Sequence, residues 1–226
     1  MRRELHVDGR LLATHKDGRS HLDAYLDDHT LLIDAVLELQ QLRWNGEELA
    51  FAISLAEALL ARFEDRERGG CYFTSHDHEE LIVRTRSFGD EATPSGNGIA
   101  AQVLQRLGRL LAEPRYLDAA ERTPRAETSV MARYPHGHAS MLAALEDFLD
   151  PLLVIVLRGP AAGIEAWRAA LARHYDPRRL VIAIPAGIEA LPAALADNAA
   201  GKAPLANVCR GLSCGEPLTT LDALLA

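Results

Sequence analysis

The chain has 226 residues, of which 48% are hydrophobic and 25% charged, and its formal net charge at pH 7 is -8. These values suit a globular protein with one substantial core and room for a second small one. The acidic balance argues against a nucleic-acid partner, and no apolar run reaches the roughly 18 residues that span a membrane. Because no secretory apolar core follows Met1, we expect a cytoplasmic location and no membrane partner.

The first half of the chain has helical periodicity. Apolar residues predict a long, largely covered helix over 25–42 and a second over 47–63, which form an antiparallel hairpin. After Gly69-Gly70, the segments 71–74 and 81–84 predict a short β-hairpin around a polar turn. The chain therefore makes a small β excursion between helix pairs.

Helical patterns resume and then give way to alternating strands and helices. Further helices are predicted over 95–111, 114–120 and 136–149. The second region begins near Asp150-Pro151. Its pattern predicts an apolar strand over 152–157, a helix over 164–174 and a second apolar strand over 180–184. A third short strand over 206–209 and a closing helix over 218–225 follow. The strand, helix, strand order favours parallel pairing. We expect a mainly helical domain over 1–150 and a small α/β appendage over 151–226.

The segment from Asp90 to Gly98 combines acids, a helix start and glycines. Ser95 is a suitable N-cap, and Gly96 and Gly98 leave room for another group near the backbone. A helix N-terminus of this kind can hold an anion or a polar ligand, although the same residues also suit an ordinary capped helix.

Two other polar groups are candidates for a site. Asp27 and Asp28 lie at the start of a mostly apolar helix, and their side chains point about 100° apart. We therefore expect one of them to face a polar cavity. Alternatively, both are simply acids in the first turn, where the helix dipole stabilises negative charge. Arg84 is placed to meet Asp90 or a bound anion, or to form a plain surface ion pair. The histidine-rich turn over 76–80 has no second ligand group, and we expect it to be solvated, with no metal and no cofactor.

Cys209 and Cys214 are separated by four residues, unlike the two-residue gap of thioredoxin-type redox pairs. A redox role is the less favoured interpretation. Three cysteines do not make a disulfide framework, which fits a reducing compartment. Neither a nucleotide-binding fingerprint nor a serine-hydrolase elbow is present.

The order of several motifs resembles a family of thioredoxin-domain-containing proteins that includes spermatogenesis-associated protein 20. The resemblance covers nearly the whole chain and rests on Leu26-Asp27-Asp28 before a long helix, Gly69-Gly70-x-Tyr72-Phe73, Leu81-Ile82-Val83-Arg84, Asp90 with Pro94-Ser95-Gly96-Asn97, and the tail with Cys209, Cys214 and Pro217. It implies a larger protein with a thioredoxin-like domain, an α/α toroid similar to six-hairpin glycosidases, and an α/β appendage. The thioredoxin-like domain has no counterpart in this chain.

The resemblance further implies a partial toroid, since about five helices are legible before Pro151 against about twelve in a full ring. An open ring leaves apolar helix flanks that a second copy or a partner chain would cover. By analogy with such toroids, a carbohydrate-binding cavity would be lined by Asp27, Asp28, Arg84, Asp90, Ser95 and Asn97. Asp28 and Asp90 are the candidate catalytic pair of a glycosidase, and His29 and His138 are the candidates for an epimerase.

Three hypotheses follow. The first is a carbohydrate-binding or carbohydrate-processing domain, in which Asp28→Asn weakens sugar binding. The second is a noncatalytic interaction module that docks through its open helical flank. The third is a thiol redox accessory that uses Cys209 and Cys214.

Overall fold

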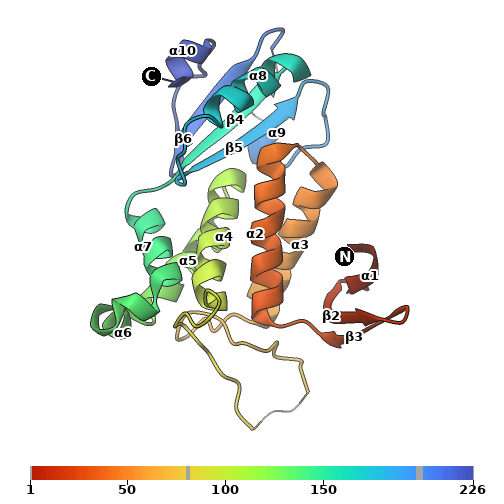
Figure 1. Cartoon of the computed structure of the whole chain (residues 1–226), viewed down its shortest axis with the longest axis vertical. Helices are drawn as coiled ribbons and strands as arrows, with labels where there is room; N and C mark the ends of the chain where they lie inside the picture. Colours follow the sequence, from red (N-terminus) through yellow and green to blue (C-terminus); the bar gives the residue numbers. More distant parts are fainter. Residues whose placement is uncertain (1, 80–81, 197–200, 226) are drawn as a thin grey trace.

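The computed structural model describes residues 2–79, 82–196 and 201–225, and it contains helices together with two small sheets (Figure 1). Helical residues outnumber strand residues, so the expected mainly helical, mixed composition is confirmed. The chain begins with α1 (Arg2–Leu5), β1 (His6–Val7), β2 (Arg10–Lys16) and β3 (Arg19–Asp23). The helices that follow are α2 (Leu26–Leu42), α3 (Gly46–Arg62), α4 (Gly96–Leu111), α5 (Pro114–Arg125), α6 (Thr128–Arg133), the 3-10 turn η1 (Pro135–Gly137) and α7 (Ala139–Leu149).

The three-stranded sheet at the start of the chain was not expected from the sequence. Strands β1, β2 and β3 pair antiparallel in chain order. Both turns are Asp-Gly pairs, and all four residues have positive φ, at 50° and 74° for Asp8 and Gly9 and at 52° and 74° for Asp17 and Gly18. Asp-Gly is the strongest short sequence signal for such a hairpin turn. This signal was available in the sequence and was missed.

The first expected helical hairpin is confirmed, and two side chains fix its turn. Gln40 exchanges two hydrogen bonds of 3.0 Å with the backbone N–H and C=O of Asn45. The Asn45 side chain in turn accepts hydrogen bonds from the N–H groups of Glu47 and Glu48, at 3.0 and 3.1 Å, and thereby caps α3. The end of α2 and the start of α3 are therefore held together by side chains of the turn itself.

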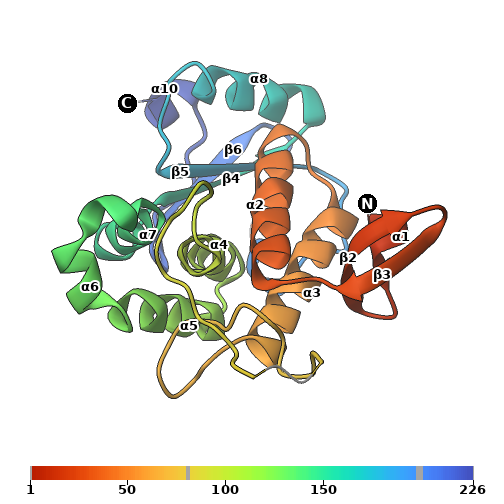
Figure 2. The same cartoon turned by 60° about the horizontal axis from the view of Figure 1, so that its bottom comes forward.

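Helix α4 lies in the middle of the helical group, with α2, α5 and α7 around it (Figure 2). The helices expected over 95–111 and 136–149 are present, with α7 beginning at Ala139. Helix α5 runs past its expected end through Pro124, and α6 was not expected. The wider arrangement as part of a toroid stays a prediction.

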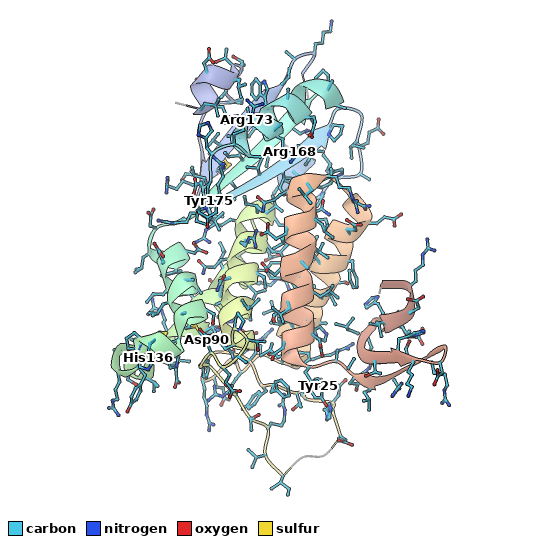
Figure 3. The ribbon with its side chains drawn as sticks, in the orientation of Figure 1. Tyr25, Asp90, His136, Arg168, Arg173 and Tyr175 are labelled. Carbon is cyan, nitrogen blue, oxygen red and sulfur yellow. A yellow bond between two sulfur atoms is a disulfide. The ribbon has the colours of Figure 1, made fainter. Side chains whose placement is uncertain are left out.

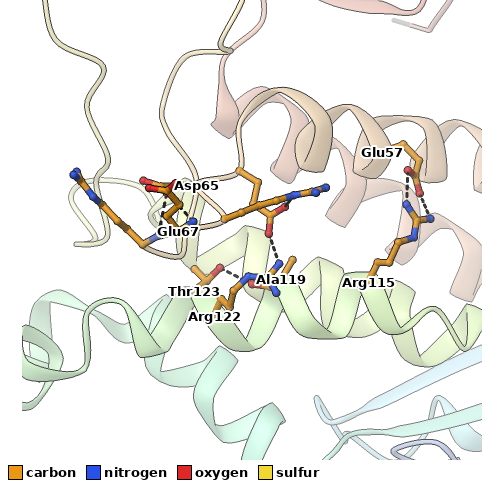
Figure 4. A network of polar contacts seen from close by, with 10 residues as sticks. Glu57, Asp65, Glu67, Arg115, Ala119, Arg122 and Thr123 are labelled. Atoms are coloured by element: carbon orange, nitrogen blue, oxygen red, sulfur yellow. Dashed lines mark hydrogen bonds and ion pairs between the residues drawn. The ribbon is translucent and has the colours of Figure 1, made fainter.

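Ion pairs join α3 to α5 along their exposed sides (Figure 4). The Arg115 guanidinium donates to both oxygens of Glu57, at 2.9 and 3.1 Å, and the hydroxyl of Tyr116 donates to the same carboxylate at 2.7 Å. Two residues beyond the end of α3, Glu64 pairs with Arg122. These contacts fix how α5 lies across the end of α3.

The last third of the chain forms a four-stranded sheet in the order β5-β4-β6-β7. Its elements are β4 (Leu153–Gly159), α8 (Ala161–Leu171), β5 (Arg179–Pro185), α9 (Ala193–Ala196), β6 (Leu205–Arg210), β7 (Ser213–Cys214) and α10 (Leu221–Leu225). Strands β4 and β5 are parallel and are joined through α8, as the strand, helix, strand order predicts. Strand β6 returns antiparallel on the other side of β4.

Both faces of this sheet are buried. Val154, Val156 and Ile182 belong to the same apolar core as α2, α3 and α4, whereas Ile155 and Leu157 pack in a second cluster with α8. At the outer edge of β5, the N–H of Val181 donates to the side chain of Gln41 on α2, at 3.1 Å. The sheet and the helices thus share one core, and the proposed division at residue 150 into two domains stays a prediction.

The prediction of a β-hairpin over 71–74 and 81–84 is wrong for the described part of the segment, in which no strand forms. Leu81 lies outside the described residues. Cys71 makes one isolated bridge to Glu64, and the N–H of Phe73 donates to the carbonyl of Thr85 at 2.9 Å. The reason is that a side chain, Asn97, occupies the position of a strand partner for Cys71.

Candidate functional site

The long connection between α3 and α4 covers one end of the helical group, where α4 and α7 begin (Figure 1). Tyr72 organises this connection. The Arg84 guanidinium lies 4.1 Å above the Tyr72 ring, and the Tyr72 hydroxyl donates to Asp65 at 2.9 Å. Arg84 also donates to the carbonyl of Thr74 at 2.6 Å. The structure therefore uses Arg84, an expected ligand contact, to hold the loop together.

Asp90 joins the starts of two helices. One of its oxygens accepts the backbone N–H of Ser95 at 2.9 Å together with the hydroxyl of Ser140, and the other accepts the backbone N–H of Ser140 at 2.8 Å. Burial alone would raise the pKa of Asp90, but the hydrogen bonds from Ser140 and Ser95 outweigh it and hold that pKa below its usual value. An ionised carboxylate with three donors is a structural clamp and a poor candidate for a general acid.

Ser95 and Asn97 also have structural partners. The Ser95 hydroxyl accepts the N–H of Gly98 at 3.0 Å, which confirms it as the N-cap of α4. Asn97 is fully buried; its oxygen accepts the N–H of Cys71 at 2.6 Å, and its NH2 group donates to the carbonyls of Cys71 and Ser87 at 3.0 and 2.8 Å. Asn97 ties the loop to α4 from inside the protein.

A hollow of about 300 Å³ opens beside the start of α4, which is at the lower end of the usual size of ligand sites. It is lined by Leu26, Asp27, Phe73, Ser87, Gly89, Glu91, Thr93, Pro94, Ser95 and Gly96. Of the six expected cavity residues, it brings together Asp27 and Ser95. Glu91 and Phe73 were not predicted from the sequence as site residues. For Glu91, its position next to Asp90 was the available signal.

Asp27 is the distinctive group of this hollow. Its carboxylate lies directly against α4, because a Cβ atom at Gly96 would stand only 2.1 Å from Asp27 Oδ1. Burial, together with the neighbouring charge of Asp28, raises the pKa of Asp27. Among the described residues, no side chain or backbone group donates a hydrogen bond to this carboxylate. Asp27 is therefore half-buried with its acceptor oxygens available to a ligand.

An aromatic ring forms part of another wall of the hollow. Phe73 stacks on Tyr25, with 4.8 Å between ring centroids and 9° between ring planes. Figure 3 places Tyr25 and Asp90 at the same end of the helical group, with the appendage at the opposite end. Tyr25 immediately precedes α2, so the start of that helix positions both the Asp27 carboxylate and the support of the Phe73 ring.

Asp28 lies on a different side of α2. It is exposed, accepts the N–H of Tyr25 at 2.8 Å, and lines a separate hollow beside the N-terminal strands. The two adjacent acids thus point in different directions, as helix geometry requires. Asp90 lines neither this hollow nor the one beside α4, and Asp28 is absent from the latter, so the geometry of these two hollows does not favour them as a catalytic pair.

The two histidines considered for an epimerase are both buried. Their Nδ1 atoms lie 2.9 Å from backbone carbonyls four residues earlier, that of Tyr25 for His29 and that of Tyr134 for His138. Burial lowers the pKa of His29. Neither histidine lines the hollow beside α4. Within the described residues, no group of three or more metal-ligating side chains comes together, and no helix is long and apolar enough to cross a membrane.

Cys209 and Cys214 form a disulfide across the β6–β7 hairpin, and a redox role for this pair stays a hypothesis. The hairpin belongs to the sheet at the far end of the molecule from the hollow (Figure 1). The third cysteine, Cys71, is free and buried, and burial raises the pKa of its thiol far above the usual range.

Two proteins share distant similarity with this chain. It is 25% identical over 214 residues to the uncharacterized protein B0495.5 of Caenorhabditis elegans, which covers 92% of this chain and 29% of that protein. It is similar to spermatogenesis-associated protein 20. With the protein of that name from Rattus norvegicus, the identity is 26% over 162 residues, or 70% of this chain and 20% of the relative. The chain thus spans less than a third of the length of either relative, and no protein-family model matches it.

Proposed function

We propose that this chain is a carbohydrate-binding domain, related to six-hairpin glycosidase-like toroids, and that the hollow beside α4 holds one small polyhydroxylated molecule. The observation that carries the proposal is Asp27, a half-buried carboxylate without a hydrogen-bond donor among the described residues, in the same hollow as the stacked ring of Phe73. A carboxylate accepts hydrogen bonds from sugar hydroxyls, and an aromatic face packs against the apolar C–H groups of a sugar ring.

Binding is favoured over hydrolysis. A glycosidase requires two carboxyl groups on opposite sides of the scissile bond, one of them able to donate a proton. Asp90 accepts three hydrogen bonds from protein donors and has a lowered pKa, and Asp28 lies outside the hollow. The acids that line the hollow are Asp27, which is half-buried and has a raised pKa, and Glu91, which is exposed. We therefore propose a noncatalytic role for the site in this chain.

The experiment is a titration with neutral hexoses and their disaccharides, followed by protein NMR chemical-shift changes or by calorimetry. Asp27→Asn removes the charge while keeping the shape, and loss of a charged hydrogen bond of about 1.5–3 kcal/mol weakens binding by about 10- to 100-fold. Phe73→Ala removes the stacking face and also weakens binding.

Asp28→Asn is the matched control, because it makes the same chemical change on the neighbouring residue outside the hollow. Its oxygen still accepts the N–H of Tyr25. We expect Asp28→Asn to bind sugar as the unaltered chain does, in contrast to the expectation from the sequence. Equal affinity of all three variants, or no sugar binding at millimolar concentration, would contradict the proposal.

A further inference from the structure

Helix α2 exposes a stripe of apolar side chains along one face. Leu31, Leu39 and Leu42 are 42%, 41% and 63% exposed, and Ala35 is also exposed between them. At 3.6 residues per turn, these four positions fall within about 80° of the helix circumference. Other faces of α2 are covered by α3, α4 and β5. We call these four residues the α2 stripe.

The surface beside the α2 stripe is hollowed and largely apolar. A hollow of about 320 Å³ is lined by Leu31, Leu32 and Ala35 from α2 and by Leu11 and Leu12 from β2. A second hollow, of about 550 Å³, shares Leu32 with the first. Apolar residues line it together with polar ones, namely Leu32, Val36, Leu39 and Phe51 with Arg3, Glu4, Asn45, Glu47 and Glu48. An exposed apolar stripe between two hollows is a surface that water solvates poorly and that another protein surface would cover.

The stripe is complementary to itself when a second copy of α2 runs antiparallel. With the two helices crossing at Ala35, Leu31 of one copy lies opposite Leu39 of the other. The same reversal brings Asp28, at the N-terminal end of one stripe, next to Leu42 and Arg43 of the other copy. The small side chain of Ala35 at the crossing point lets the two backbones approach closely. The pairing therefore matches leucine with leucine along the stripe and brings Asp28 near Arg43 at both ends, where Arg43 also pairs with Glu48 of its own chain at 2.8 Å.

We propose that two copies of this chain associate through the α2 stripe, antiparallel and with their two-fold axis at Ala35. Two features favour a second copy as the occupant: the reversal symmetry of the stripe, and the opposite charges of the exposed Asp28 and Arg43 at its ends. The stripe is small compared with the roughly 800 Å² per partner of a standard interface, and the net charge of -8 repels a second copy. We therefore expect a dissociation constant on the order of micromolar.

The first test is the molar mass of the full 226-residue chain by sedimentation velocity between about 1 and 100 μM, a range chosen to bracket micromolar affinity. The expected result is a shift from 24.7 kDa to twice that mass as the concentration rises. Leu39→Lys places a charge in the stripe and should keep the chain monomeric throughout. Leu149→Lys, a leucine that is 72% exposed on α7, is the matched control and should dimerise normally.

The second test examines the geometry by oxidative cross-linking. Ala35→Cys places a thiol on the proposed two-fold axis, so that two copies form a disulfide with each other. Leu39→Cys is the control on the same stripe, because two such residues would lie eight residues, or about 12 Å, apart along the antiparallel helices. Cross-linking through position 35 and not through position 39 is the expected result.

Two results would overturn the proposal. A monomer at every concentration would show that the stripe does not bind a second copy and would leave it to a different partner. A dimer that persists in Leu39→Lys, or that cross-links equally at both positions, would show that the copies associate elsewhere or in another orientation. Titration of Leu39→Lys with sugar tests the proposed function independently, because sugar binding at the hollow beside α4 does not require the second copy.

Discussion

The carboxylate of Asp90 accepts hydrogen bonds from both the backbone N–H and the hydroxyl of Ser140, fifty residues further along the chain. The same carboxylate accepts the N–H of Ser95, so one side chain satisfies free donors at the starts of α4 and α7. This contact holds in place the helix start that forms one wall of the hollow, and it leads to the first prediction.

Asp90→Asn should destabilise the protein by about 1–3 kcal/mol, because an amide replaces one acceptor oxygen with a donor that faces the donors of Ser140. Urea unfolding followed by circular dichroism measures the change. Glu91→Gln, on the adjacent exposed acid, is the control and should stay within about 0.5 kcal/mol of the unaltered chain. A similar small effect for Asp90→Asn would contradict the structural role.

The contribution of Asp90 to stability should depend on pH. Its pKa in the folded protein is lowered, so its stabilising effect is present above the ordinary carboxyl value of 3.8 and is lost as the pH falls through the folded pKa. The difference in unfolding free energy between the unaltered chain and Asp90→Asn should therefore be constant near pH 6–7 and shrink below about pH 4. A difference that grows on acidification would have the wrong sign.

Gly96→Ala should weaken sugar binding and lower stability, although alanine is the better helix former. The added Cβ would stand 2.1 Å from Asp27 Oδ1, so the carboxylate must move from its place in the hollow. We expect a loss of about 1–3 kcal/mol in unfolding free energy, the usual cost of overpacking. Gly137→Ala is the matched control, because no heavy atom lies within 4 Å of its added Cβ.

Asn97→Ala should be among the most destabilising single substitutions in the chain. It leaves both backbone groups of Cys71 and the carbonyl of Ser87 without their side-chain partner, at a cost of about 3 kcal/mol or more. Thermal unfolding provides the measurement. Asn45→Ala, which removes an ordinary helix cap, should cost about 1 kcal/mol, and an equal effect of the two would argue against the special role of Asn97.

Replacing Cys209 and Cys214 by serine should reduce stability by about 2 kcal/mol, since the disulfide closes a short loop. Sugar binding should stay unchanged because the hairpin lies at the opposite end of the molecule. Cys71→Ser, on the free buried cysteine, separates this effect from a general loss of thiols. Sugar affinity that changes reversibly with the redox state would contradict this prediction and favour the redox-accessory hypothesis instead.

Periodicity in the sequence was sufficient for the long helices and the parallel strands, because their apolar positions also decide which faces are buried. It failed where side chains replace backbone pairing. The segment around Cys71 has the composition of a strand, yet Asn97, 26 residues away, supplies its hydrogen bonds. The N-terminal sheet was missed although its Asp-Gly turns were visible.

Part of the candidate site was also accessible from the sequence. Asp27 was selected as one of two adjacent acids, but which of them turns inward depends on where α4 begins relative to α2. Asp90, Asn97 and Arg84 were selected as polar residues near the expected cavity, and each is instead engaged with protein partners. Polar composition indicates a region of the chain, whereas only the fold shows which groups have acceptors or donors available.

The contact between Gln41 and Val181 has a further consequence for how the protein behaves at high concentration. Strand β5 is the outer strand of its sheet, and such an edge is a template on which other chains can add strands and aggregate. The side chain of Gln41 accepts the hydrogen bond of the Val181 N–H in the middle of that edge, and α2 lies beside it. The helix that exposes the apolar stripe therefore also shields the edge of the sheet, so that the addition of further strands at β5 is disfavoured.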